Sequence, residues 1–250
     1  MGFGVAAQFM DQGLSSQALP GLNKPMLVTD IETALEPFGL RSLGAFHPAL
    51  DEPVPGAGDL AATTVVLVGG AGPDMWRVFS AETRDEREPN PLDAWSRRTL
   101  GQIAGKLGGR ALFPFDGPPY LPFQAWAMRA RSLHRSPIGP LIDPEFGLWL
   151  GYRGALVIPE KIEIAPIIPV PSPCLACPDR PCLTACPVGA FAKGSYDVPA
   201  CIGHLETPSG QQCFEKACLA RRACPVGAGH GHGPDQAMFH VKHFFAAHQK

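Results

Sequence analysis

The first 173 of the 250 residues contain no cysteine, which excludes disulfides and thiolate-bound metals from most of the chain. No apolar run approaches the roughly 20 residues that a bilayer-spanning helix needs. The start, MGFGVAAQFMDQG, lacks the basic region and following apolar block of a secretory signal. We therefore expect a cytoplasmic protein without a membrane partner.

Neither positive nor negative charge is in large excess. The formal net charge is −2, and no run of Lys and Arg forms the basic patch that nucleic-acid binding requires. We therefore expect no nucleic-acid partner. Apolar residues make up 45% of the chain, which is enough for one large domain or two smaller ones to bury a core.

Helix and strand patterns alternate in the part without cysteine. Residues 24–39, 90–109 and 121–130 are predicted to be helices, and residues 40–47, 63–70, 110–115 and 147–160 to be strands. Asn90 is expected to cap the second helix, with Pro91 at its first position. Residues 67–76, LVGGAGPDMW, are interpreted as a strand that ends in a simple glycine turn. This interleaving predicts an α+β domain over residues 23–158, preceded by a flexible arm at residues 1–22.

A proline-rich segment follows this domain. Residues 159–173, PEKIEIAPIIPVPSP, contain five prolines and are predicted to form a stiff, extended linker. Residues 174–250 are then rich in Cys, Gly and Pro and poor in apolar side chains. A small domain of that composition needs covalent or metal staples to be stable.

The cysteines form two groups with different spacing. Cys174, Cys177, Cys182 and Cys186 follow the pattern C-x2-C-x4-C-x3-C-P, and Cys201, Cys213, Cys218 and Cys224 are spread more widely. The sequence CPVGA begins at both Cys186 and Cys224, which indicates an internal repeat. In iron–sulfur runs of this kind, the first three cysteines hold one cluster and the fourth, before proline, ligates the other. Proline stops the helical turn that follows the third cysteine, so the fourth thiolate points elsewhere.

Two other interpretations of the cysteines remain open. Eight cysteines could form four disulfides, which require an oxidising compartment that the N-terminus does not indicate. They could also form two structural zinc sites, which prefer two separated C-x2-C knuckles, whereas this chain has one. Two iron–sulfur clusters are the interpretation that the spacing favours.

The cysteine pattern resembles the bacterial dicluster ferredoxin domain, with the longer loop found in ferredoxin-type subunits of complex oxidoreductases. The resemblance implies a small ferredoxin-like domain with two 4Fe–4S clusters. It assigns Cys174, Cys177, Cys182 and Cys224 to the first cluster and Cys186, Cys201, Cys213 and Cys218 to the second.

The front half resembles the epoxyqueuosine reductase and cobalamin-processing families, which share a nitroreductase-like domain. The stretch around Tyr152 and Arg153, GLWLGYRGALVIP, is similar to a cobalamin-processing segment, and FPFDGPP at Asp116 is similar to an epoxyqueuosine reductase turn. ACIGHLETPSG, which contains Cys201, is similar to a stretch in the same reductases. The resemblance spans most of residues 25–225. It implies a domain that binds cobalamin, with flavin as the alternative, through Tyr152 and Arg153, and a catalytic proton donor at Asp116.

Each of these residues also has a simpler interpretation. Asp116 lies between an apolar strand and flanking prolines, where burial would raise its pKa and suit it to proton donation. It could instead be a turn carboxylate bonded to backbone amides. Arg153 could bind a ligand phosphate or carboxylate, or form an ion pair across the strand.

Six of the eight histidines follow Cys201. His230, His232, His240 and His243 could form a metal site. We instead expect His240 to lie in a closing amphipathic helix with Phe239, Phe244 and Phe245, packed beside the clusters.

Three functions follow from these observations. The first is an iron–sulfur electron-transfer protein that docks a redox partner, which serves as its electron donor. The second is a cobalamin- or flavin-dependent reductase of a small-molecule substrate, in which Asp116 supplies the proton. The third is an interaction protein with structural zinc. The residues alone leave open whether the chain is an enzyme.

Overall fold

A four-stranded antiparallel sheet forms the centre of the front half. The computed structural model describes residues 25–49, 51–82, 88–192 and 194–249, so the expected arm at residues 1–22 lies outside it. The strand order is β1-β2-β6-β3. The strands are β1 (Arg41–Phe46), β2 (Thr64–Ala71), β3 (Arg110–Leu112) and β6 (Leu150–Ile158). Every residue of β2 is buried, because both faces of the sheet are covered.

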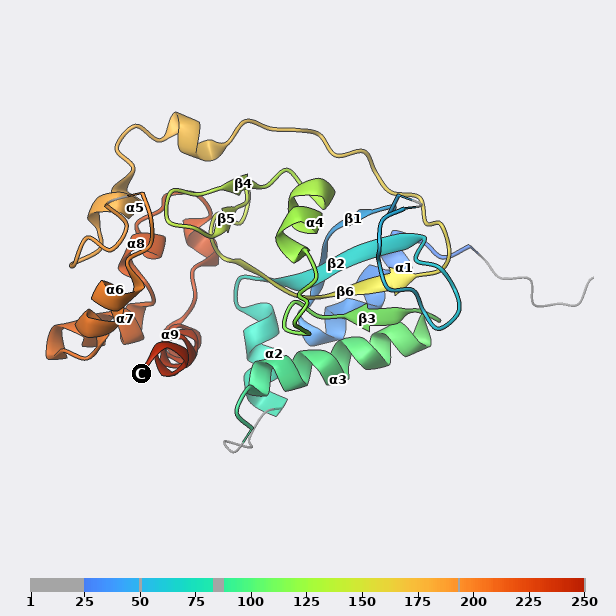
Figure 1. The fold of residues 1–250 in the computed structure, drawn as a ribbon, viewed down its shortest axis with the longest axis horizontal. Coiled ribbons are helices and arrows are strands. Elements are labelled where there is room, and N and C mark those ends of the chain that lie inside the picture. Colours follow the sequence, from blue (N-terminus) through green and yellow to red (C-terminus); the bar gives the residue numbers. More distant parts are fainter. Residues whose placement is uncertain (1–24, 50, 83–87, 193, 250) are drawn as a thin grey trace, which may run out of the picture.

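Helices cover both faces of this sheet (Figure 1). On one face lie α1 (Val28–Leu35), α2 (Asp74–Glu82) and α3 (Pro91–Lys106), packed on Val66 and Val68. On the other lies α4 (Phe123–Ala130), packed on Val65 and Leu67. Successive residues of a strand point to opposite faces, so the run of β-branched residues in β2 supplies both cores. The predicted α+β class is confirmed.

The observed elements around α1, α2 and α3 differ in detail from the predicted ones. The first helix ends in a 3-10 turn, Glu36–Phe38, and Gly39 follows at φ +63°. Asn90 occupies the N-cap position of α3 as predicted, but its side chain makes no capping hydrogen bond, and its backbone carbonyl accepts from Asp93 N and Ala94 N instead. The glycine turn after β2 leads directly into α2, which the sequence interpretation missed. Gly72 lies in this turn at φ +75°, a conformation that favours glycine.

A small hairpin extends from the front half towards the cysteines. Its strands are β4 (His134–Arg135) and β5 (Leu141–Ile142), which pair antiparallel. The turn between them has Gly139 at φ +102°. The sequence analysis expected no element here.

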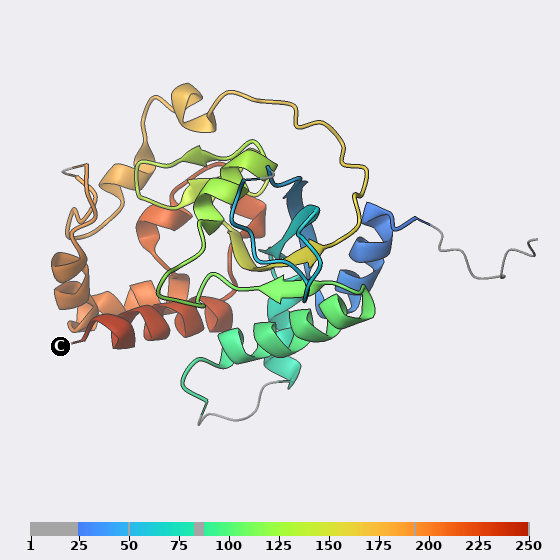
Figure 2. The same ribbon diagram turned by 45° about the vertical axis from the view of Figure 1, so that its right-hand side comes forward.

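The proline-rich segment carries the chain back over the molecule (Figure 2). Residues 161–172 contain neither helix nor strand and are mostly exposed. β6 ends at one side of the sheet, and the segment returns the chain to the side where β6 begins. It is attached near its start, where Ile162 N donates to Thr64 Oγ1 at 3.1 Å, and near its end, where Val170 N donates to Ser132 Oγ at 3.0 Å and Val170 O accepts from His134 Nε2 at 2.9 Å.

The described cysteine-rich residues contain helices and no strand. The helices are α5 (Pro181–Thr184), α6 (Val198–Leu205), α7 (Gln211–Lys216), α8 (Leu219–Arg222) and α9 (Pro234–His248), with 3-10 turns at Pro173–Ala176, Pro208–Gly210 and Ala228–His230. No helix in the described ranges has both the length and the apolar character needed to cross a bilayer.

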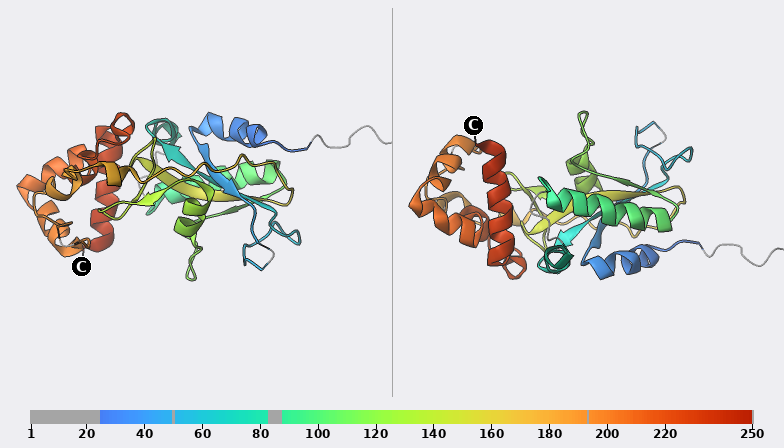
Figure 3. Two further views of the ribbon diagram at one scale, coloured as in Figure 1. Left: turned by 90° about the horizontal axis from the view of Figure 1, so that it is seen from above. Right: turned by 90° about the horizontal axis from the view of Figure 1, so that it is seen from below.

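The last helix, α9, lies between the other cysteine-rich helices and the front half (Figure 3). Phe239 packs against Trp76 at 5.1 Å between ring centroids and against Phe79 at 5.4 Å. Phe245 meets Phe214 of α7 at 5.8 Å. The helix therefore has apolar contacts on both sides, in agreement with the closing helix predicted from Phe239, Phe244 and Phe245.

Candidate metal centres

Three closely spaced cysteines and one distant cysteine line one cavity beside α5 and α8. They are Cys174, Cys177, Cys182 and Cys224, called the first quartet below. Burial raises the pKa of the Cys182 thiol, and negative charge on Cys224, Cys174 and Cys177 raises it further. The four thiols therefore line the same cavity and lie close enough for their charges to interact.

The other four cysteines line a second cavity, of about 460 Å³. They are Cys186, Cys201, Cys213 and Cys218, called the second quartet. Burial, followed by the charges of the other three, raises the pKa of Cys213 to about 11. Four thiolates packed together without a cation repel one another, so such a group is stable in ionised form only when it binds positive charge.

The structure brings together the same two sets of four that the resemblance implies. Cys186 leaves its sequence neighbours for the second quartet, and Cys224 joins the first. The chemical nature of the ligand at each quartet remains a prediction.

All eight cysteines are free thiols, so no disulfide joins any two of them in this structure. In the described ranges, no three His, Cys, Asp or Glu side chains are close enough to hold one metal ion. In a structural zinc site made of thiolates, four sulfur atoms each lie about 2.3 Å from one zinc ion.

A half-buried cation lies beside the second quartet. The Arg221 guanidinium donates to Leu148 O from Nε at 2.8 Å and lies 4.5 Å from the Trp149 ring. No carboxylate in the described part of the chain pairs with it. Burial lowers the pKa of Arg221 to about 10, although negative charge on Cys218 acts in the opposite direction. A half-buried cation without a carboxylate partner is stabilised by negative charge nearby, so this site fits an anionic group at the second quartet.

The β4–β5 hairpin of the front half lines both cavities. Pro137 and Ile142 line the first, and Ile138, Gly139 and Pro140 line the second. No pattern in the sequence predicted that these residues would lie beside the cysteines. Their only signal was the turn sequence SPIGP at residues 136–140.

A buried carboxylate holds the base of this hairpin. The Asp143 side chain is fully buried and accepts hydrogen bonds from Glu145 N at 2.8 Å, Phe146 N at 2.9 Å and the Arg131 guanidinium. Burial alone would raise the pKa of Asp143, but the Arg131 hydrogen bond and the two amides outweigh it, so the pKa is lowered.

We expect Asp143→Asn to lower the free energy of unfolding by about 2 to 3 kcal/mol at pH 7, below the full cost of breaking a buried pair because Arg131 keeps some solvent contact. A lowered carboxylate pKa stabilises the fold above the unfolded pKa of about 3.9 and stops doing so as pH falls through the folded value. The difference from wild type should therefore shrink below about pH 4. Urea unfolding followed by tryptophan fluorescence measures it. Glu145→Gln, at the exposed partner of Arg131, should cost less than about 1 kcal/mol; equal losses would contradict the role of Asp143.

Asp116 lies in a different environment from the one expected. Its side chain is 42% exposed rather than buried, and it forms an ion pair with Arg97 of α3 at 2.6 Å. The Arg97 guanidinium also stacks over Phe113 and Phe115 at 5.0 and 5.2 Å. The premise that burial prepares Asp116 for proton donation is therefore wrong. Its partner is a side chain, not the turn amides of the alternative interpretation.

Tyr152 and Arg153 do not share a site. The Tyr152 hydroxyl donates to Leu43 O of β1 at 3.2 Å, and burial raises its pKa. Arg153 forms an ion pair with Asp93 of α3 and donates to Ser96 Oγ at 3.0 Å. Neighbouring residues of β6 point to opposite faces, so the expected pair of cofactor-binding residues is divided between the two layers. For Arg153 the structure shows an ion pair, formed with a helix on one face of the sheet.

The histidines are not gathered at one point. The His232 ring lies 5.0 Å from both Trp149 and His240, while His230 packs against Phe146 at 4.9 Å. Burial and the nearby Arg221 lower the pKa of His232 to about 2 and that of His240 to about 4. His232 and His240 both line the second cavity.

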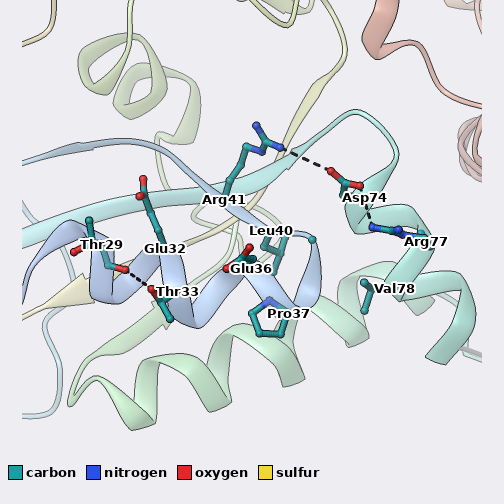
Figure 4. Close-up of a pocket in the computed structure, with 11 residues that line it drawn as sticks. Thr29, Glu32, Thr33, Glu36, Pro37, Leu40, Arg41, Asp74, Arg77 and Val78 are labelled. Atoms are coloured by element: carbon teal, nitrogen blue, oxygen red, sulfur yellow. Dashed lines mark hydrogen bonds and ion pairs between the residues drawn. The ribbon is translucent and has the colours of Figure 1, made fainter.

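A further cavity, of about 640 Å³, lies between α1 and α2 in the front half (Figure 4). It contains none of the residues singled out from the sequence. The charged side chains Arg41, Asp74 and Arg77 in its wall are paired with one another and partly exposed.

The fold and the quartets together define an α+β protein in which a helical cysteine-rich segment is closed by a hairpin of the sheet domain. No protein-family model matches the chain, and no curated protein does. Among solved structures, it is similar to epoxyqueuosine reductase from Bacillus subtilis with its catalytic loop swung out of the active site. That match has 18% identity and a TM-score of 0.42, and covers 70% of this chain and 52% of the other.

A second similar structure is epoxyqueuosine reductase with an epoxyqueuosine-modified tRNA-Tyr stem loop. Here the identity is 18% and the TM-score 0.44, with 71% of this chain and 52% of the other covered. This chain thus spans about half the length of the solved structures it matches. A similarity of this size does not establish a shared activity.

Proposed function

We propose that this protein transfers electrons through two 4Fe–4S clusters, one at each quartet. The observation that carries the proposal is the exchange of Cys186 and Cys224, which completes each quartet with a cysteine from the other part of the segment. When bound, a 4Fe–4S cluster supplies one-electron chemistry at a potential set by its surroundings.

The residues of this chain have distinct roles in that proposal. The eight thiolates hold the clusters, and Arg221 offsets negative charge at the second one. Ile138 and Ile142, with 4% and 1% of their surface exposed, exclude water from the two cavities. A redox partner that docks on this chain would serve as the electron donor.

Anaerobic purification or reconstitution tests the proposal directly. We expect a brown protein with about eight iron and eight sulfide per chain, and an EPR signal of reduced 4Fe–4S clusters. Two zinc ions per chain without sulfide would instead establish the structural-zinc alternative.

A reductase activity is a second candidate, favoured by one observation: the front half lines both cavities through its hairpin. Clusters in these cavities would therefore lie close to any electron acceptor that binds to the front half. Cobalamin or flavin would be that acceptor and a small molecule the substrate. Titration of hydroxocobalamin or flavin into the reconstituted protein tests this candidate, and absence of binding leaves the electron-transfer function alone.

A further inference from the structure

The two quartets share a hydrophobic core with the front half. Ile138, Ile142 and Leu148 belong to one apolar cluster together with Cys182 and Cys224, and the other cysteines in contact with it are Cys174, Cys186, Cys201 and Cys218. The front half is therefore part of the interior around both quartets.

Within this core, the hairpin divides its side chains between the two cavities. Ile142 lies in β5 and lines the first cavity, whereas Ile138 lies in the turn and lines the second. The two isoleucines are four residues apart, and neither lines the cavity of the other. Each quartet thus has one buried isoleucine of its own from the same hairpin.

The hairpin is held at both ends. At its start, His134 Nε2 bonds to Val170 O at 2.9 Å. At its end, Asp143 and Gly147 exchange backbone hydrogen bonds of 2.8 Å in both directions. The turn is closed by Ser136 N to Pro140 O at 3.2 Å. The hairpin backbone is therefore held by the front half and by the proline-rich segment, while the side chains of Ile138 and Ile142 pack among the cysteines.

We propose that this hairpin sets the reduction potentials of the two clusters separately, through Ile142 at the first and Ile138 at the second. The inference rests on the proposed function. A reduced cluster carries one more negative charge than an oxidised one, so an apolar wall disfavours reduction and a polar group or water favours it. Any ligand or partner that moves the hairpin then changes the potentials at both sites.

The test uses Ile138→Thr and Ile142→Thr in the full-length, reconstituted protein, with redox titration followed by EPR. Each threonine has the shape of valine, one methylene smaller than isoleucine, and replaces a methyl group with a hydroxyl. We expect Ile138→Thr to raise one of the two potentials and Ile142→Thr to raise the other. A tenfold change in the ratio of reduced to oxidised cluster at a fixed potential corresponds to about 59 mV.

Ile138→Val and Ile142→Val are the matched controls, because they remove one methylene and remain apolar. Both should keep the wild-type potentials. If a threonine variant does not fold, the alanine variant at that position opens the same wall to water and should shift the potential in the same direction.

Iron and sulfide contents separate the two ways of failing. If the wild type binds no clusters, the proposed function is wrong. If all variants carry full clusters, the hairpin proposal is overturned by unchanged potentials, by both threonines shifting the same potential, or by valine and threonine giving equal shifts.

Discussion

Replacing Cys186 with alanine should remove the second cluster and leave the first one in place. Cys186 follows the first three cysteines closely in sequence, but it lines the second cavity with Cys201, Cys213 and Cys218. Iron should fall from about eight to about four atoms per chain. The remaining EPR signal should keep the potential of the first cluster.

Cys182→Ala is the matched control, since Cys182 lies four residues earlier and lines the first cavity. It should remove the first cluster and retain the second, so the two variants should leave signals with different potentials. If both variants lose the same cluster, the four closely spaced cysteines hold one centre and the exchange is wrong.

Gly227→Ala should strongly destabilise the contact between the two parts of the molecule. Gly227 has φ +66°, and a Cβ there would lie 2.2 Å from the carbonyl carbon of Phe146. Backbone cannot give way as a side chain can, so the left-handed conformation and the clash together should cost about 3 kcal/mol or more. Because Cys224 is three residues away, iron at the first quartet should be lost as well. Thermal unfolding and iron content measure both effects.

The internal repeat provides the control for this variant. Gly189 occupies the same place in the first CPVGA and has φ +61°, but the nearest atom to its Cβ would be Ala192 Cβ at 3.9 Å. Gly189→Ala should therefore cost only the conformational term of about 1 to 2 kcal/mol. Similar losses in the two variants would show that conformation alone, and not the contact with Phe146, makes Gly227 necessary.

Patterns with strong local causes were predictable from the sequence. The run Val65–Val68 predicted β2, because β-branched residues buried on both faces are typical of a central strand. Pro91 and Gly108 gave the approximate bounds of α3. The cysteine spacing alone gave two groups that differ from the observed quartets by the exchange of Cys186 and Cys224, and the resemblance to dicluster ferredoxins implied that exchange.

Features that depend on long-range contacts were not predictable. The hairpin strands have two residues each, too few for a periodic pattern. Asp116 is paired with Arg97, on a helix 19 residues earlier, and nothing around the FPFDGPP turn indicates that partner. The separation of Tyr152 from Arg153 follows from strand alternation and could have been foreseen, had the resemblance not grouped them.

The long proline-rich segment has a consequence for assembly. The cysteine-rich helices pack at the start of β6, while residues 159–173 leave from its end, so this interface does not depend on which chain supplies each half. An extended stretch of that length spans about 45 Å, enough to connect the end of β6 with the cysteine-rich helices of the same molecule. A shortened segment would satisfy the same contacts only by exchanging halves between two copies. We therefore expect deletions within this exposed stretch to favour a swapped dimer over a monomer, which size-exclusion chromatography would detect.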